Sequence, residues 1–204
     1  MKLDIGETKF SIDVSFALCV TLMLILDENG LGALALFCCI FHEAAHIACL
    51  RFLGESPACV KLSFYGIKLE RFPNANLGRA GEIIVYACGP AANIILSAIL
   101  FFLSFLNSSL RTAAMISLMT GMFNLVPCCP LDGGNILKCV LELFFEEEKS
   151  ESLSFAVSLA VLLPMTAVSV FVIIKTGNLT LALVTAYLLG VSFLNKNEKG
   201  YRFF

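Results

Sequence analysis

Long apolar segments separated by short polar ones dominate the pattern along this chain. Six apolar runs can be counted, at residues 10–26, 31–53, 80–106, 112–131, 153–174 and 179–194. A helix that crosses a bilayer needs about 20 mostly apolar residues, each adding about 1.5 Å of rise. The pattern therefore predicts an all-α polytopic membrane protein with about six transmembrane helices.

The longest polar interruption covers residues 54–79, between the second and third runs. Within it, residues 60–72 alternate between apolar and polar positions on both sides of Tyr65-Gly66, which indicates a short β-hairpin. Short alternations are common in loops, so a plain surface hairpin and a functional one are both open. In the functional reading, Phe64, Tyr65 and Gly66 are candidate substrate-binding residues.

The first run is the weakest, because its uninterrupted core at residues 14–26 is short enough for a secretory signal. Ala33-Leu34-Ala35 even offers a small-residue cleavage pattern. Acidic residues are mixed with the basic ones before this run, and the polar segment 27–30 precedes the supposed cleavage site. These features favour a retained membrane anchor.

Composition and charge agree with a membrane protein. Hydrophobic residues make up 58% of the chain and charged residues 15%, whereas soluble domains have about 25% charged residues. Of the 14 basic residues, all but Arg111 and Lys175 lie on the side of the N-terminus, so both termini are predicted to be cytoplasmic. The net charge of −2 gives no indication of a nucleic-acid partner. The nine cysteines form no CxxC pair and are interpreted as small apolar residues.

His42 and His46 lie inside the second run, and Glu43 directly follows the first of them. Residues four apart on a helix project from one face, so both imidazoles can reach a single ion. Zinc hydrolases use this HExxH arrangement: two imidazoles hold Zn²⁺, and the glutamate handles the proton of the reacting water. The motif predicts His42 and His46 as zinc ligands and Glu43 as the general base.

The alternative is that HExxH occurs here by chance, as it does in some helices that bind nothing. Ionisable groups near the middle of a bilayer are costly and usually functional. The chain also contains only two histidines, and both fall at ligand spacing. Metal binding is therefore favoured over chance.

A tetrahedral catalytic zinc site needs one more protein ligand besides water. Asp132 follows a segment in which Pro127 and Pro130 break a helix, and Gly133-Gly134 allow a tight backbone path. Irregular backbone at membrane depth is tolerated only where protein or a water-filled cavity surrounds it. Asp132 is the predicted third ligand. Alternatively, it caps the helix that follows, because aspartate is a good N-cap residue.

Gly89, Pro90 and Asn93 lie within the third run. Glycine and other small residues let helices approach closely, and an asparagine amide in apolar surroundings can bond to a neighbouring helix or to a substrate carbonyl. The residues by themselves favour helix packing, and the substrate contact stays open.

Three motifs together resemble those of the site-2 proteases, a family of intramembrane zinc metalloproteases. They are His42-Glu-Ala-Ala-His46, Gly89-Pro-Ala-Ala-Asn93 and Asn124-Leu-Val-Pro-Cys-Cys-Pro-Leu-Asp132-Gly-Gly, in that order and spacing. The resemblance covers residues 30–140, and the six predicted spans agree with the sporulation-type branch. It implies that His42, His46 and Asp132 bind Zn²⁺, that Glu43 is the general base, and that Asn93 engages substrate. Asn124 is a further substrate-binding candidate.

The resemblance also implies the setting of the reaction. The substrate would be a membrane protein cut in or near the lipid bilayer, and the chain an integral protein of a bacterial cytoplasmic membrane with a regulatory membrane partner. A sigma-factor precursor fits the sporulation-type branch, and an anti-sigma factor fits the wider family. The chain is predicted to be one domain, residues 1–204, with no PDZ insert and no CBS domain, which puts nucleotide-linked regulation in doubt.

Other classes of protein remain as alternatives. One family of zinc transporters carries HExxH-like residues in a membrane helix, but a carrier needs further ligands along its path and this chain has no third histidine. A membrane-anchored protease for soluble substrates would need a sizeable aqueous domain, and the pattern shows none. A pseudoenzyme is disfavoured because the three predicted ligands and the base are all present.

Overall fold

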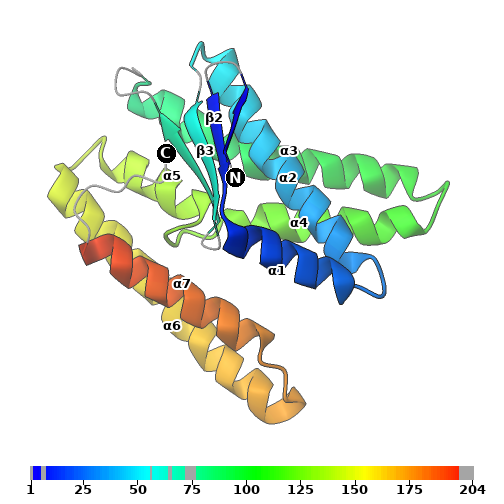
Figure 1. Ribbon diagram of the computed structural model, residues 1–204. Helices are drawn as coiled ribbons and strands as arrows, with labels where there is room; N and C mark the ends of the chain where they lie inside the picture. Colours follow the sequence, from blue (N-terminus) through cyan, green and yellow to red (C-terminus); the bar gives the residue numbers. More distant parts are fainter. Residues whose placement is uncertain (1, 6–7, 56, 64–65, 72–76, 198–204) are drawn as a thin grey trace. The chain divides into compact units, whose positions relative to one another are not determined.

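The computed structural model describes residues 2–5, 8–55, 57–63, 66–71 and 77–197 of the chain. Helices dominate these residues, and one four-stranded sheet accompanies them (Figure 1). The chain forms two compact units, which divide between Phe123 and Asn124.

Each of the six predicted apolar runs overlaps one helix, and a seventh helix in the described part of the chain, α5 (Asp132–Leu141), lies outside the runs. The helices are α1 (Val14–Ile25), α2 (Leu31–Phe52), α3 (Arg79–Leu103), α4 (Ser109–Asn124), α5 (Asp132–Leu141), α6 (Glu147–Thr176) and α7 (Thr180–Asn197). Among the described residues, α2, α3 and α6 are long and apolar enough to cross a membrane, and the chain is an integral membrane protein. Shorter apolar stretches lie in α1 and α7, so a crossing by all six runs stays a prediction.

The sheet contains four strands in the order β1 (Lys2–Ile5), β2 (Thr8–Ile12), β3 (Pro57–Ser63) and β4 (Gly66–Arg71). β3 and β4 pair antiparallel in the region where the alternation indicates a hairpin. β1 and β2 also pair antiparallel, whereas β2 runs parallel to β3. β3 therefore has a partner on both sides, and β1 and β4 are the edges of the sheet.

The N-terminal strands differ from the expected all-α pattern. Residues 10–12, which the hydropathy pattern assigns to the first membrane run, belong to β2, and α1 begins only at Val14. Strands of four and five residues give little alternation to detect. The pairing that extends the sheet is also distant in sequence, since Ile12 lies opposite Leu62.

A carboxylate in the turn between α1 and α2 supports the start of α2. The N-cap position is Gly30, at a positive φ of 71°, and it has no side chain to cap the helix. Asp27 Oδ2 instead accepts a hydrogen bond from the backbone N–H of Ala33 at 2.9 Å. Hydrogen bonds from the Ala33 and Gly32 N–H groups hold the pKa of Asp27 below its ordinary value, because they stabilise the charged carboxylate.

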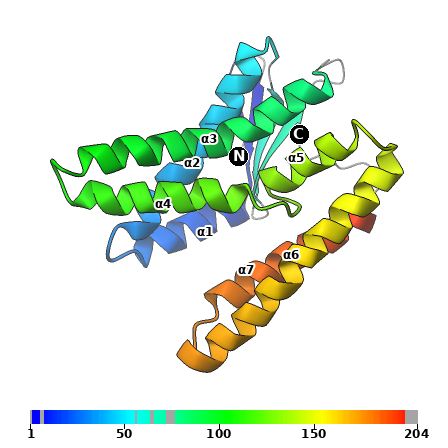
Figure 2. The ribbon, with the colours of Figure 1, turned by 180° about the vertical axis from the view of Figure 1, so that it is seen from behind.

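Helices α2, α3 and α4 pack through faces of small or polar residues. The buried residues follow the helical repeat of three to four positions, singly or as adjacent pairs: Cys38, His42, His46 and Leu50 on α2; Glu82, Val85, Tyr86, Gly89, Pro90, Asn93 and Ser97 on α3; Ala113, Ala114, Ser117 and Gly121 on α4. Figures 1 and 2 show α3 and α4 side by side, and two hydroxyls join them. Ser97 Oγ donates to Ala114 O at 2.7 Å, and Ser117 Oγ donates to Asn93 O at 2.9 Å.

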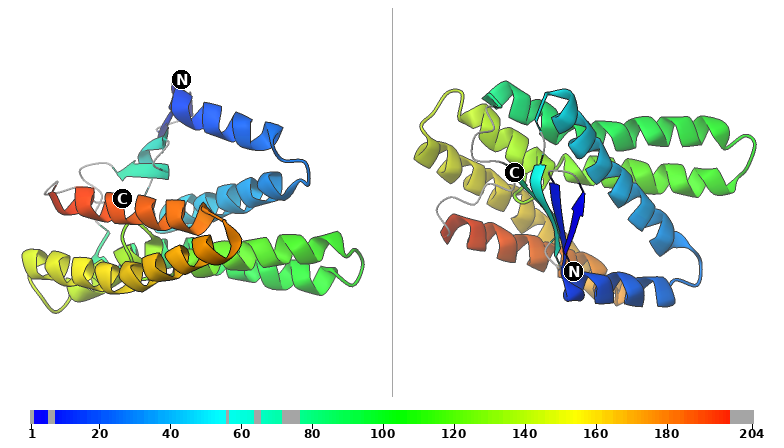
Figure 3. Two further views of the ribbon diagram at one scale, coloured as in Figure 1. Left: turned by 90° about the horizontal axis from the view of Figure 1, so that it is seen from below. Right: turned by 45° about the horizontal axis from the view of Figure 1, so that its top comes forward.

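In the second unit, α6 and α7 lie side by side and hold the segment 125–131 that leads into α5 (Figure 3). Cys128 is fully buried and packs with Leu162 and Leu188. The Cys129 N–H donates to Ser158 Oγ on α6 at 3.1 Å, and Ser192 Oγ on α7 donates to the Cys129 carbonyl at 2.6 Å. Both long helices thus fix the backbone three residues before Asp132.

Candidate metal centre

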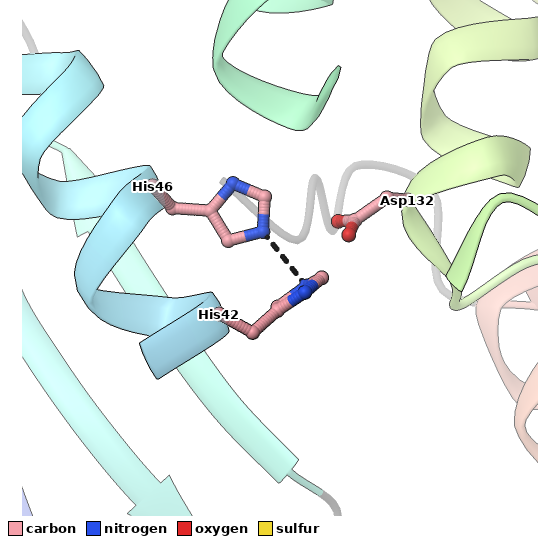
Figure 4. A group of neighbouring side chains, drawn as sticks. All are labelled: His42, His46 and Asp132. Atoms are coloured by element: carbon pink, nitrogen blue, oxygen red, sulfur yellow. Dashed lines mark hydrogen bonds between the residues drawn. The ribbon is translucent and has the colours of Figure 1, made fainter. Parts of the chain in front are cut away.

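The two histidines lie on the buried face of α2, one turn apart. His42 is 4% exposed and His46 is 1% exposed, and their Nε2 atoms are 3.1 Å apart (Figure 4). Zn–N distances of about 2.0–2.1 Å in a tetrahedral site separate two nitrogen ligands by roughly 3.3 Å. The spacing of the two Nε2 atoms therefore fits ligands of one ion.

A backbone carbonyl of α3 fixes the orientation of the His46 ring. His46 Nδ1 lies 2.7 Å from Val85 O. A carbonyl oxygen only accepts hydrogen bonds, so Nδ1 of His46 carries the proton and Nε2 of the neutral ring keeps its lone pair. An Nδ1–H bond to a backbone carbonyl is the usual support of a metal-binding histidine.

Gly89 leaves the space that the two rings occupy. A Cβ atom at this position would lie 2.3 Å from His46 Nε2 and 2.8 Å from His42 Cε1. These distances are far below ordinary van der Waals contact, so α3 can approach α2 this closely only with glycine here. The sequence predicts that Gly89 serves helix packing. In the structure the side chains that pack against Gly89 are the two histidines, so the close approach also shapes the candidate metal centre.

Asn93 lies one turn after Gly89 on α3 and contacts the ring of His42. The residue is fully buried, and its Nδ2 lies 3.5 Å from His42 Nδ1. Ser117 on α4 holds the Asn93 backbone carbonyl. Asn93 thus belongs to the surroundings of the histidine pair, and its contact is with a predicted ligand.

Asp132 is the first residue of α5 and is 8% exposed. The N-cap position of this helix is Leu131, so Asp132 is the first helical residue and not the N-cap. Close backbone packing holds its position, since a Cβ on Gly133 would lie 2.2 Å from Leu125 O. Among the described residues, His42, His46 and Asp132 form a group that could hold a metal ion, with one ligand atom each (Figure 4).

The remaining predicted site residues are placed less fully. Glu43 is half-buried on α2, directly after His42. Asn124 is the half-buried last residue of α4, and Gly66 is the first residue of β4, opposite Ser63. Phe64 and Tyr65 lie outside the described residues. The substrate-binding roles of these residues stay predictions.

Several groups around the centre carry no signal in the sequence. The Val85 carbonyl is a backbone group, so any residue could supply it. Ser117, Ser158 and Ser192 lie in largely apolar helices, where serine usually bonds back to its own helix. Only the fold shows that their hydroxyls reach the residues next to the predicted ligands.

Comparison with known proteins agrees with the predicted resemblance. The sequence profile of peptidase family M50 matches residues 104–165, which contain α4, α5 and the Asp132 motif. Rip3 of Mycobacterium tuberculosis, named as a zinc metalloprotease, is 33% identical over 110 residues, or 49% of this chain and 28% of the relative. A zinc metalloprotease of Methanocaldococcus jannaschii is 29% identical over 140 residues, or 61% of this chain and 39% of the relative. The chain thus spans well under half the length of both.

A solved structure resembles the whole chain. The site-2 protease from Methanocaldococcus jannaschii superimposes with a TM-score of 0.71 at 22% sequence identity, covering 99% of this chain and 97% of the other. At this identity the similarity establishes the fold. The resemblance to site-2 proteases predicted from the three motifs is confirmed.

Proposed function

We propose that this chain is an intramembrane zinc metalloprotease of the site-2 type, which hydrolyses a peptide bond in or near a membrane-embedded segment of another protein. The observation that carries the proposal is the buried histidine pair, with Nε2 atoms 3.1 Å apart on a helix long enough to cross a membrane. Zinc-dependent hydrolysis explains why two imidazoles at ligand spacing and a neighbouring carboxylate lie in an apolar helix: the imidazoles bind the ion and the carboxylate accepts a proton.

His42, His46 and Asp132 would hold the zinc ion. When bound, zinc would polarise a carbonyl and lower the pKa of a water molecule towards about 7. Glu43, next to His42, takes the proton of the attacking water and returns it to the leaving amine. The amides of Asn124 and Asn93 are candidate donors to the substrate carbonyl.

The sheet offers a way to hold an unwound substrate. A transmembrane helix hides its peptide bonds, so the segment around the cleavage site has to become extended and loses its own backbone hydrogen bonds. Strand addition to a sheet edge replaces them with little dependence on sequence. Since β3 is paired on both sides, the edge strands β1 and β4 are the places where a substrate could pair. Phe64 and Tyr65, which precede β4 in the sequence, and Gly66, its first residue, are proposed to contact the substrate there.

The proposal includes an orientation and a class of partner. The excess of basic residues on the N-terminal side supports cytoplasmic termini. The sporulation-type resemblance supports a bacterial cytoplasmic membrane. The sporulation-type resemblance supports a sigma-factor precursor as substrate, with an anti-sigma factor as the wider-family alternative, and a regulatory membrane protein as partner. A single functional domain of residues 1–204 is part of the same proposal.

A zinc transporter is the other candidate, and the observations do not favour it. Transport needs successive ligand sites along a path. Among the described residues, one group of histidine and acidic side chains could hold a metal ion. Zinc flux into proteoliposomes without proteolysis would support the transporter.

Substitution of Glu43, the proposed general base, tests the proposed function. Glu43→Gln keeps the shape of the side chain but cannot accept the proton, so cleavage should fall by about 10²- to 10⁴-fold while zinc remains bound. Wild type and variant would each be co-expressed with membrane substrates, and fragments present only with the wild type would be identified by membrane proteomics. Glu28→Gln, on the exposed α1–α2 turn, is the matched control. Cleavage by purified Glu43→Gln at the wild-type rate would refute the mechanism.

A further inference from the structure

The buried amide of Asn93 has one polar atom without a partner, and it lies next to a predicted zinc ligand. Asn93 is fully buried on α3, and its Oδ1 accepts no hydrogen bond from any described residue. Its other polar atom, Nδ2, faces His42 Nδ1 at 3.5 Å. A buried acceptor without a donor is rare and calls for an explanation.

The contacts of the His42 ring with His46 and with Asn93 are linked through the single proton of the neutral ring. His46 Nε2 has the lone pair, because Nδ1 of His46 donates to Val85 O. The contact between the two Nε2 atoms is then a hydrogen bond only if His42 Nε2 carries the proton. In that tautomer His42 Nδ1 accepts from Asn93 Nδ2, and Nε2 of His42 has no lone pair for a metal.

Metal binding requires the opposite tautomer of His42. For Nε2 to be a ligand, the proton of the neutral ring has to sit on Nδ1, which then needs an acceptor. Rotation of the Asn93 amide by about 180° exchanges its oxygen and nitrogen in place. The rotated amide presents Oδ1 to His42 Nδ1–H, so one rotation supplies the acceptor and gives Oδ1 the donor it lacks.

We infer that Asn93 is a positioning residue that sets the tautomer of His42: its amide oxygen accepts the Nδ1–H of His42 and so opens Nε2 to zinc. This inference rests on the proposed function, since it presupposes that His42 binds the ion. It assigns to α3 the support of both rings, with the Val85 carbonyl holding His46 and the Asn93 amide holding His42. A direct contact of Asn93 with the substrate carbonyl would depend on the Nδ2 donor. The positioning role depends on the Oδ1 acceptor, so the two roles can be separated by substitution.

Two substitutions separate the oxygen from the nitrogen. Asn93→Asp keeps an acceptor and removes the donor, whereas Asn93→Leu removes both at similar size. Loss of a hydrogen-bond partner of a metal ligand typically lowers metal affinity by about 10- to 100-fold. We therefore expect zinc affinity, measured by chelator competition on the purified full chain, to fall about 10- to 100-fold in Asn93→Leu and to stay near the wild type in Asn93→Asp.

A spectroscopic measurement distinguishes positioning from a general loss of structure. The chain has two histidines, so labelling with ¹⁵N-histidine gives only two ring systems. In the zinc-loaded wild type and Asn93→Asp, both rings should show a slowly exchanging Nδ1–H proton. Asn93→Leu should keep the signal of His46, which Val85 holds, and lose that of His42. Retention of the His46 signal also shows that the variant is folded.

The outcomes separate this inference from the proposed function. A wild-type protein that binds no zinc would overturn the proposed function. A wild type that binds zinc, together with Asn93→Leu of equal affinity and two slowly exchanging Nδ1–H signals, would overturn the role of Asn93 alone. Loss of zinc affinity in both variants would likewise contradict an acceptor role for the amide oxygen.

Discussion

Substitution of Gly89 by alanine tests whether the close approach of α3 shapes the metal centre. The added Cβ would lie 2.3 Å from Nε2 and 2.6 Å from Cε1 of His46, and 2.8 Å from Cε1 of His42. Both rings are buried and hydrogen-bonded, so neither is the free end of a flexible side chain. The methyl group therefore has to displace either the histidine pair or the helix that carries it.

The size of the displacement follows from these distances. Ordinary van der Waals contact begins near 3.4 Å, so the contact of 2.3 Å requires a shift of about 1.1 Å. A shift of His46 by this amount breaks its 2.7 Å bond to Val85 O or moves its Nε2 away from His42. Since a misplacement of about 1 Å in an active site can cost about 10²-fold in rate, we expect Gly89→Ala to lose about 100-fold in cleavage, or about 2.7 kcal/mol.

Two measurements test this prediction: zinc affinity by chelator competition, and cleavage of a co-reconstituted membrane substrate. Gly190→Ala is the matched control, because Gly190 is an exposed helical glycine whose Cβ would have no neighbour within 4 Å. That control should bind zinc and cleave as the wild type does. A Gly89→Ala protein with wild-type zinc affinity and cleavage would refute the argument from close approach.

The other predictions concern the segment that leads to Asp132. Gly133→Ala places a Cβ 2.2 Å from the Leu125 carbonyl oxygen, so we expect loss of zinc binding and a lower unfolding temperature, and normal values of both would contradict this packing. Ser192→Ala removes the 2.6 Å bond to Cys129 O, worth about 1 kcal/mol, and should lower thermal stability and zinc affinity. Ser169→Ala is its control because Ser169 Oγ donates to Thr166 O within α6 itself, and an equal effect of both variants would argue against a role for the segment.

Sequence reasoning finds the parts of the centre that depend on local spacing or on unusual residue types. The histidine pair follows from a four-residue spacing in an apolar run, and the candidate third ligand follows from a carboxylate beside a helix break. The apolar runs locate the helices for the same reason, since burial in lipid demands long uninterrupted stretches.

The remaining features depend on contacts between distant residues. The approach of α3 that gives Gly89 and Val85 their roles requires the packing of two helices. The strands β1 and β2 are too short to show a pattern, and β2 becomes part of the sheet only by pairing with β3. Nothing in the chain order predicts that Ser192 on the last helix would hold the Cys129 backbone.

The parallel pairing of β2 with β3 also constrains how the chain is threaded through the bilayer. Strands that hydrogen-bond to each other lie on the same side of the membrane, and α1 and α2 are the connection between these two. If α2 crosses the membrane, α1 has to carry the chain across in the opposite direction. Removal of the first run would also remove β1 and β2 and would expose an edge of β3, so the sheet depends on the segment that precedes α1.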